Sequence, residues 1–285
     1  MAMKKRQTKL ETLVRYAMVY HLSGVLPLYV INEFPKSGGS WVGQMLSRAL
    51  GLSFPRNQFP QLKSCILHGH YLHPGINNVL IVWRDGRDDI ISWYHHCLFL
   101  NESGRNKPVV DRLRQKFQFT DYTDLHANLP EFIEHCFTEK YPMKFSWKDF
   151  VNKWINEKTA VFVRYEDLRT AGAEELCRVV KELTGEPLSP VRANAIIDEF
   201  SFAKQAGRAP GMENKNSFLR KGIVGDWKNH FSLEARQLFD QFVGNELIQL
   251  GYEQNHDWVD DGALPAATKI VLVKNDSKSN APIAS

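Results

Sequence analysis

The chain has 285 residues, and its composition of 43% hydrophobic and 24% charged residues is typical of a globular enzyme with a sizeable core. The formal net charge of +4 fits an anionic ligand, but nucleic-acid binders are usually more basic, so no nucleic-acid partner is expected. The four cysteines form no C-x-x-C pair, which argues against a zinc or redox motif. Reduced thiols and the lack of a targeting segment favour a cytoplasmic location.

The N-terminal segment is rather apolar from residue 13 to residue 31, but Arg15 and His21 interrupt it. A membrane-spanning helix needs ~20 uninterrupted apolar residues, so no transmembrane segment is predicted. The segment also runs directly into a motif at Pro35, which leaves no room for a cleaved signal and a spacer. We expect residues 1–26 to form a helical extension, and contact with a membrane surface is the alternative.

Short apolar runs alternate with helical patterns along the chain. The predicted strands are 28–31, 79–83 and 159–163, and the predicted helices begin near residues 40, 88 and 173. Strands that alternate with helices form parallel sheets covered on both faces. We therefore predict an α/β fold, with one domain over residues 27–260 and a central parallel sheet flanked by helices.

Three stretches depart from this alternation. Residues 101–156 are rich in aromatic side chains and are predicted to form a mostly helical insertion, which either packs into the core or shapes an acceptor pocket. Residues 201–225 hold many glycines, asparagines and basic residues, which indicates a long functional loop. Residues 261–285 are expected to be a loose tail, in which the apolar run 270–273 could add one edge strand.

Residues 34–41 join the first strand to its helix and predict a phosphate-binding loop. The first N–H groups of a helix lack internal partners and attract anions. Gly38 and Gly39 allow close backbone approach, Lys36 adds a positive charge, and Ser40 adds a hydroxyl near the helix start. An ordinary turn with a serine cap is the alternative. Lys36 precedes both glycines, whereas in the nucleoside triphosphate loop the lysine follows the last glycine.

Two further segments carry cations where an anion could bind. Arg84 follows the second strand and faces the crevice at the carboxyl edge of the sheet, and Ser92 lies about two turns into the following helix. Surface pairing of Arg84 with a nearby aspartate is the alternative. Arg220 and Lys221 stand next to Gly222 and make a compact anion site, or else a solvated charged loop.

These segments resemble three signatures of the sulfotransferases that use 3'-phosphoadenosine 5'-phosphosulfate (PAPS). Residues 35–41 are similar to P-K-S-G-T-T-W, with departures at Gly39 and Ser40, where the family has threonines. Arg84 and Ser92 fit R-x-x-x-D-x-x-x-S, and residues 220–231 match R-K-G-x-x-G-D-W-K-N-x-F at every fixed position. The three signatures stand in the family's order, and the resemblance spans residues 29–239.

The resemblance implies a fold like that of the P-loop nucleotide-binding proteins, with PAPS as donor and 3'-phosphoadenosine 5'-phosphate (PAP) as product. The loop would hold the 5'-phosphosulfate, and the later basic segments would bind the 3'-phosphate. Three aromatic residues would contact the adenine, although core packing is the alternative role for these residues. The implied cofactor-binding residues are Lys36, Ser37, Gly38, Gly39, Ser40, Trp41, Arg84, Ser92, Tyr165, Phe202, Arg220, Lys221 and Gly222.

Sulfuryl transfer should resemble phosphoryl transfer, in which positioning and electrostatics dominate. A base of near-neutral pKa would take the acceptor's proton, and histidine suits this role. Aligning residues 66–67 with the short strand that precedes the family's base puts His70 at the base, with His68 as the alternative. The resemblance implies that Lys36 stabilises the departing oxygen and that Ser92 holds Lys36 back until the acceptor arrives. No metal is expected.

Two other functions remain open: an ATP-dependent small-molecule kinase, and a non-catalytic nucleotide-binding protein on the same fold. The acceptor, through a hydroxyl or an amine, could be a small molecule, a lipid or a carbohydrate. A homodimer is possible but is not predicted, because the family's dimer motif is altered here at Ser232, Leu233 and Gln237.

Overall fold

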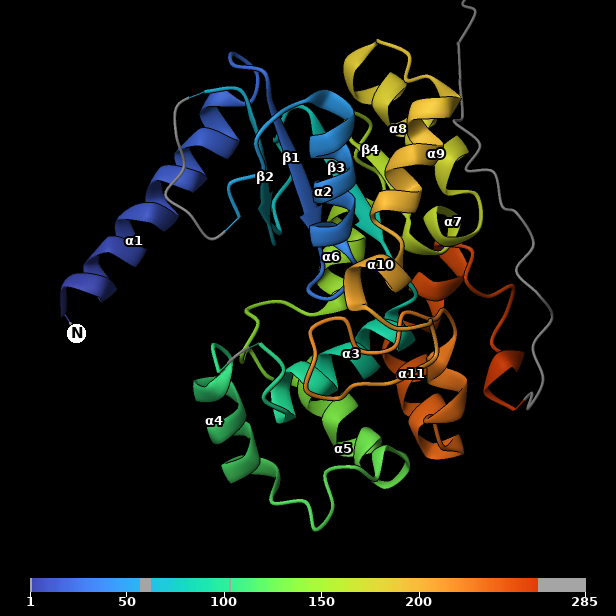
Figure 1. The fold of residues 1–285 in the computed structure, drawn as a ribbon. Coiled ribbons are helices and arrows are strands. Elements are labelled where there is room, and N and C mark those ends of the chain that lie inside the picture. The colour runs from blue at the N-terminus through green and yellow to red at the C-terminus, as the bar shows by residue number, and fades with distance from the viewer. Residues whose placement is uncertain (1, 57–62, 103, 261–285) are drawn as a thin grey trace, which may run out of the picture.

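The structure is a computed structural model that describes residues 2–56, 63–102 and 104–260. Four parallel strands form its sheet in the order β2-β1-β3-β4. They are β1 (Leu28–Glu33), β2 (Cys65–Gly69), β3 (Val79–Trp83) and β4 (Val161–Arg164). The predicted α/β fold with a central parallel sheet is confirmed (Figure 1).

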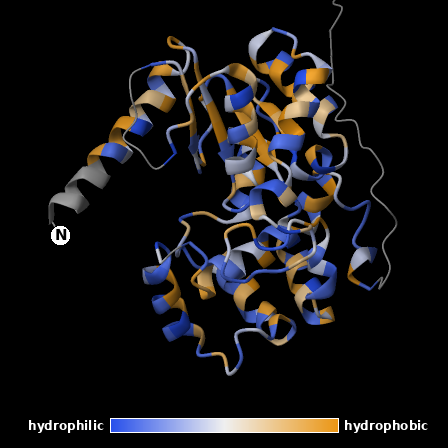
Figure 2. Ribbon diagram, viewed as in Figure 1, coloured by the Kyte–Doolittle hydropathy of each residue, from blue (hydrophilic) through white to orange (hydrophobic). Residues whose placement is uncertain are grey.

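Both faces of the sheet are covered, which explains why the strands are continuous apolar runs. All five residues of β3 are buried, and hydrophobic residues concentrate in the strands (Figure 2). One core cluster packs the sheet against α2 (Gly39–Leu50), α8 (Gly172–Thr184) and α9 (Pro190–Glu199). The other face packs against α3, α5, α6 and α11. Their bounds are Gly86–Leu98, Leu125–Thr138, Trp147–Trp154 and Leu233–Gln249.

The N-terminal helix α1 (Ala2–Ala17) projects away from the body of the molecule (Figure 1). It continues into a π-helical turn, Met18–Leu22, whose Met18 and Val19 are fully buried in the core. The chain therefore begins to pack into the core before residue 26, the residue at which we expected the N-terminal extension to end. No helix in the described part of the chain is long and apolar enough to cross a membrane.

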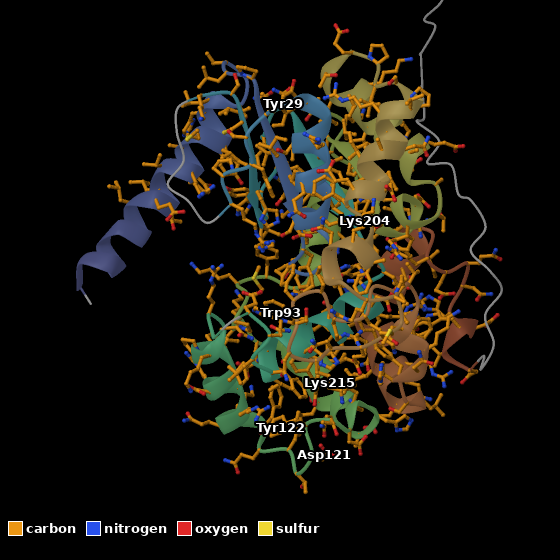
Figure 3. All side chains as sticks on the ribbon, viewed as in Figure 1. Tyr29, Trp93, Asp121, Tyr122, Lys204 and Lys215 are labelled. Atoms are coloured by element: carbon orange, nitrogen blue, oxygen red, sulfur yellow. The ribbon has the colours of Figure 1, made fainter. Side chains whose placement is uncertain are left out.

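The insertion of residues 101–156 is helical, with α4 (Lys107–Phe117) followed by α5 and α6. Asp121 and Tyr122, between α4 and α5, lie at the end of the molecule opposite Tyr29 of β1 (Figure 3). Its aromatic residues were expected either to pack into the core or to shape an acceptor pocket, and five of them are buried in the core. These five are Phe117, Phe132, Trp147, Phe150 and Trp154.

The remaining helical elements are short. They are α7 (Tyr165–Thr170), α10 (Phe202–Ala206) and the 3-10 turns Asp226–Asn229 and Asp257–Val259. The sequence predicted one long loop over residues 201–225, but α10 takes up the beginning of that stretch, and only residues 207–225 form an irregular loop with short turns. The predicted loose tail 261–285, with its possible edge strand 270–273, lies outside the described residues.

Candidate functional site

The phosphate loop turns sharply between β1 and α2. Lys36 and Gly38 have φ angles of 83° and 101°, in the left-handed region that favours glycine. A Cβ on Gly38 would lie 2.7 Å from Cδ2 of Tyr165, so the missing side chain lets the loop approach that ring. The loop thus presents the N-terminus of α2 at the carboxyl edge of the sheet, where α/β proteins bind ligands.

Lys36 points a buried ammonium into this site. Its Nζ has no hydrogen-bond partner among the described residues, Ser92 included, and lies 3.9 Å from the ring centroid of Phe218. Burial lowers the pKa of Lys36 to about 8. A buried donor without a partner is unusual in native proteins, and an anion at this point would satisfy it.

Arg84 contacts the backbone of the phosphate loop. Its Nη1 donates to the carbonyl oxygen of Lys36 at 2.9 Å, and its guanidinium lies 4.6 Å from the ring centroid of Tyr165. The side chain is 12% exposed and lies 3.9 Å from the carboxylate of Asp88, so surface pairing does not describe it. Its Nε has no partner within the described part of the chain, which leaves a second donor for an anion.

Two aspartates of α3 hold the site together, and the sequence reasoning assigned neither this role. Asp88 accepts from the backbone N–H groups of Gly225 at 2.7 Å and Trp227 at 3.0 Å, which ties the Arg220 segment to α3. Asp89 accepts from the hydroxyl of Ser37 at 2.6 Å. That bond uses the Oγ proton of Ser37, and the backbone N–H of Ser37 donates to the carbonyl oxygen of Phe34 at 3.2 Å, so both donors of this residue are engaged within the loop.

The basic pair of the third segment is partly neutralised. Arg220 Nη2 and Lys221 Nζ each lie 2.5 Å from the carboxylate of Asp226, and Arg220 also pairs with Glu213. Although burial alone would raise the pKa of Asp226, the close contacts with His230, Lys221 and Arg220 hold it far below its usual range. Asp226 therefore stays ionised and keeps the two cations together.

The three aromatic residues expected at adenine lie on separate elements. Trp41 of α2 meets Tyr165 of α7 edge-on, with ring centroids 5.5 Å apart, and its Nε1 donates to the carbonyl oxygen of Phe200 at 2.7 Å. Phe202 of α10 packs on Gly222, where a Cβ would lie 2.2 Å from its ring. Gly222 thus lets the basic segment close over Phe202.

Glu33, which the sequence reasoning missed, links the phosphate loop to His68. Its buried carboxylate accepts from the N–H of Gly39, and its Oε1 lies 2.9 Å from Nε2 of His68. Burial alone would raise the pKa of Glu33, but the hydrogen bond and charge of His68 hold it below its usual range. The carboxylate is therefore ionised at neutral pH.

His70 directly follows β2, whose last residue, Gly69, pairs with Asn32 of β1. Its Nδ1 lies 3.0 Å from the carbonyl oxygen of Glu33. A carbonyl only accepts, so Nδ1 carries the proton and Nε2 is free to act as a base. Burial of the ring and the nearby His68 lower the pKa of His70 to about 4.

Glu33, His68 and His70 also form a set that could hold a metal ion, with ligand atoms all within 4.8 Å of one another. Such a set suits zinc. The spacing of these residues in the sequence does not predict the set, because Glu33 stands 35 residues from its hydrogen-bond partner His68. The one feature that could have indicated it is that β1 and β2 are adjacent parallel strands whose carboxyl ends lie together. In the structure Glu33 is engaged by Gly39 and His68.

This fold and these donors are those of an α/β protein whose sheet ends in groups suited to a phosphorylated ligand. The family model "Sulfotransferase domain" matches residues 67–251. The chain belongs to the sulfotransferase family.

Individual relatives agree with this assignment. The chain is 23% identical over 262 residues to Sulfotransferase 6B1 of Danio rerio, and the aligned region covers 80% of this chain and 81% of that relative. It is 27% identical over 245 residues to Sulfotransferase 1E1 of Homo sapiens, which covers 76% and 83%. Its fold matches the crystal structure of mouse sulfotransferase SULT7A1 complexed with PAP, with a TM-score of 0.59 and 18% identity over 79% of this chain and 88% of that one.

Proposed function

We propose that this sulfotransferase moves the sulfuryl group of PAPS to a hydroxyl or amine of its acceptor, with His70 as general base. PAPS is the donor in this reaction and PAP the product. The observation that carries the site proposal is the buried Lys36 Nζ, which has no hydrogen-bond partner within the described residues and stands in the loop at the N-terminus of α2. A sulfuryl donor's phosphate would supply the missing partner.

The proposed transfer is an in-line displacement. A bond forms between the acceptor atom and sulfur while the bond from sulfur to the 5'-phosphate oxygen breaks, and the acceptor proton passes to Nε2 of His70. Lys36 stabilises the charge that grows on the departing oxygen. The backbone N–H groups at the start of α2 and the guanidinium of Arg84 bind the phosphates, and Arg220 with Lys221 closes over the 3'-phosphate.

The choice of His70 over His68 rests on hydrogen bonding. His68 has its Nε2 committed to the carboxylate of Glu33, whereas the carbonyl bond of His70 leaves its Nε2 free. Glu33 acts in this proposal as a positioning residue for both rings. The proposed restraint of Lys36 by Ser92 would belong to another state of the site, since the ammonium here lies over Phe218.

The acceptor is a small molecule, a lipid or a carbohydrate in this proposal, and the four cysteines, all free, agree with a reducing compartment such as the cytoplasm. A homodimer is left open.

Calorimetric titration with PAP, ATP and AMP tests the proposal. We expect selective binding of PAP, which Arg220→Ala weakens and which Lys158→Ala, at an exposed position, leaves unchanged. Equal binding of AMP and PAP would overturn it. Turnover of ATP that depends on Mg²⁺ would favour the kinase instead.

A further inference from the structure

A cavity of about 810 Å³ opens beside the phosphate loop. This volume lies within the range of small-molecule sites, roughly 300–1,000 Å³. Phe218 forms part of its wall, and the same ring lies 3.9 Å from Lys36 Nζ and 5.2 Å from the guanidinium of Arg56. The cavity therefore adjoins the atom that is proposed to stabilise the departing oxygen, so it lies near the proposed position of the sulfuryl group, which an acceptor has to reach.

The lining of this cavity is polar, whereas small-molecule pockets are mostly apolar. Phe218 is its one apolar member among the described lining residues. Asparagines 101, 214 and 216, together with Ser217, supply neutral hydrogen-bonding groups. The aromatic residues of the insertion do not make the lining apolar, because those of α5 and α6 are buried in the core or packed against it. A wholly apolar acceptor would leave these polar groups without partners, which costs free energy.

The charge of the lining is positive. Arg56 and Arg105 both line the cavity, and neither forms an ion pair with a described carboxylate. Glu102 also lines it, but His96 Nδ1 lies 3.2 Å from its Oε1. The adjacent His96 and the charges of Lys36 and Arg56 hold the pKa of Glu102 below its usual range, so Glu102 is an ionised carboxylate in this lining. Two guanidinium groups against one carboxylate leave the described lining with a net positive charge.

We infer that the acceptor carries an anionic group, a carboxylate, sulfate or phosphate, which Arg56 and Arg105 bind while its hydroxyl or amine reaches the sulfuryl group. Guanidinium forks suit these planar or tetrahedral oxyanions. The inference rests on the proposed function and adds the acceptor's chemical class. The lining amides suit a hydroxylated acceptor rather than an apolar one.

Matched acceptors that differ by one carboxylate test this inference. The protein is first saturated with PAP and then titrated with 2-naphthol against 6-hydroxy-2-naphthoate, and with methyl glucoside against methyl glucuronide. We expect at least one carboxylated probe to bind about tenfold more tightly than its neutral partner, as a charge-assisted hydrogen bond would give. Added salt should reduce the difference, because both arginines are exposed.

The Arg56→Ala and Arg105→Ala double variant should abolish the preference and leave the affinity for PAP unchanged, with Lys158→Ala as the matched control. The inference is overturned if neither carboxylated probe binds more tightly than its partner, or if the preference survives in the double variant. It is also overturned if the double variant loses PAP affinity, because the arginines would then serve the cofactor. Failure to bind PAP at the first step would instead count against the proposed function.

Discussion

The carboxylate of Glu33 occupies the space that a side chain at position 39 would fill. A Cβ on Gly39 would lie 2.7 Å from Cδ of Glu33, and the N–H of Gly39 donates to that carboxylate. The sequence departs from the family's threonine at position 39, and the structure gives the reason. The absent side chain admits a buried anion that also reaches His68.

Gly39→Thr should therefore lower both stability and PAP affinity. Overpacking a buried site costs about 1–3 kcal/mol, so we expect a loss of this size in the free energy of unfolding, measured by denaturant titration. The double variant Glu33→Ala with Gly39→Thr should recover most of it, because the two side chains compete for one space. Additive losses in the double variant would contradict this coupling.

Glu33→Gln should show that the ionised carboxylate stabilises the fold. The pKa of Glu33 in the folded protein lies below its ordinary value, so its stabilisation is present above the unfolded pKa of about 4.3 and is lost as the pH falls through the folded value. Unfolding measured from pH 7 to pH 3 should show the wild type more stable near neutrality and the difference shrinking in acid. A difference that is constant with pH would rule out the charge as its cause.

Lys36 should make PAP binding depend on pH. Burial lowers its pKa to about 8, and PAP prefers the ammonium form, so bound PAP should raise that pKa. The affinity for PAP should then fall as the pH rises above about 8, with proton uptake visible in buffers of different ionisation enthalpy. Lys36→Met should bind PAP more weakly and lose this decline, whereas an unchanged decline would point to another group.

His70→Ala should lower kcat by about 10²–10⁴-fold, the usual contribution of a general base, with PAP affinity retained. His68→Ala should lower kcat less, because the ring is proposed to position rather than to accept the proton. Single-turnover rates with PAPS and one accepted substrate separate the two variants. The reverse order of effects would move the base to His68, whose Nδ1 would then be the accepting atom.

Chelation should leave turnover unchanged, because Lys36 and Arg84 supply the charge that the reaction needs. The test is dialysis against a chelator, followed by metal analysis and assay. A loss of activity that zinc restores would show instead that Glu33, His68 and His70 hold a metal, as their 4.8 Å spacing would permit. Zinc bound without any effect on turnover would separate the set from the chemistry.

The alternation of apolar runs and helical patterns was enough to predict the α/β fold. The strands β1, β3 and β4 fall within a few residues of their predicted places, and the phosphate loop stands where Lys36, Gly38 and Gly39 indicated it. These features depend on neighbouring residues in the chain, so the local pattern carries them. The three signatures likewise lie on the expected elements, because each is a contiguous run.

Only the tertiary structure decided which distant groups meet. The parallel pairing of β1 with β2 brings Glu33 to His68 and His70, and Asp226 takes up the charges of Arg220 and Lys221. The insertion's aromatic residues pack in the core, which leaves a polar cavity beside Lys36. The sequence alone determined the strand–loop–helix units, and it predicts phosphate binding at the first of them. The order and register of the strands cannot be predicted from the local residue pattern, because they depend on packing free energies summed over the whole sheet.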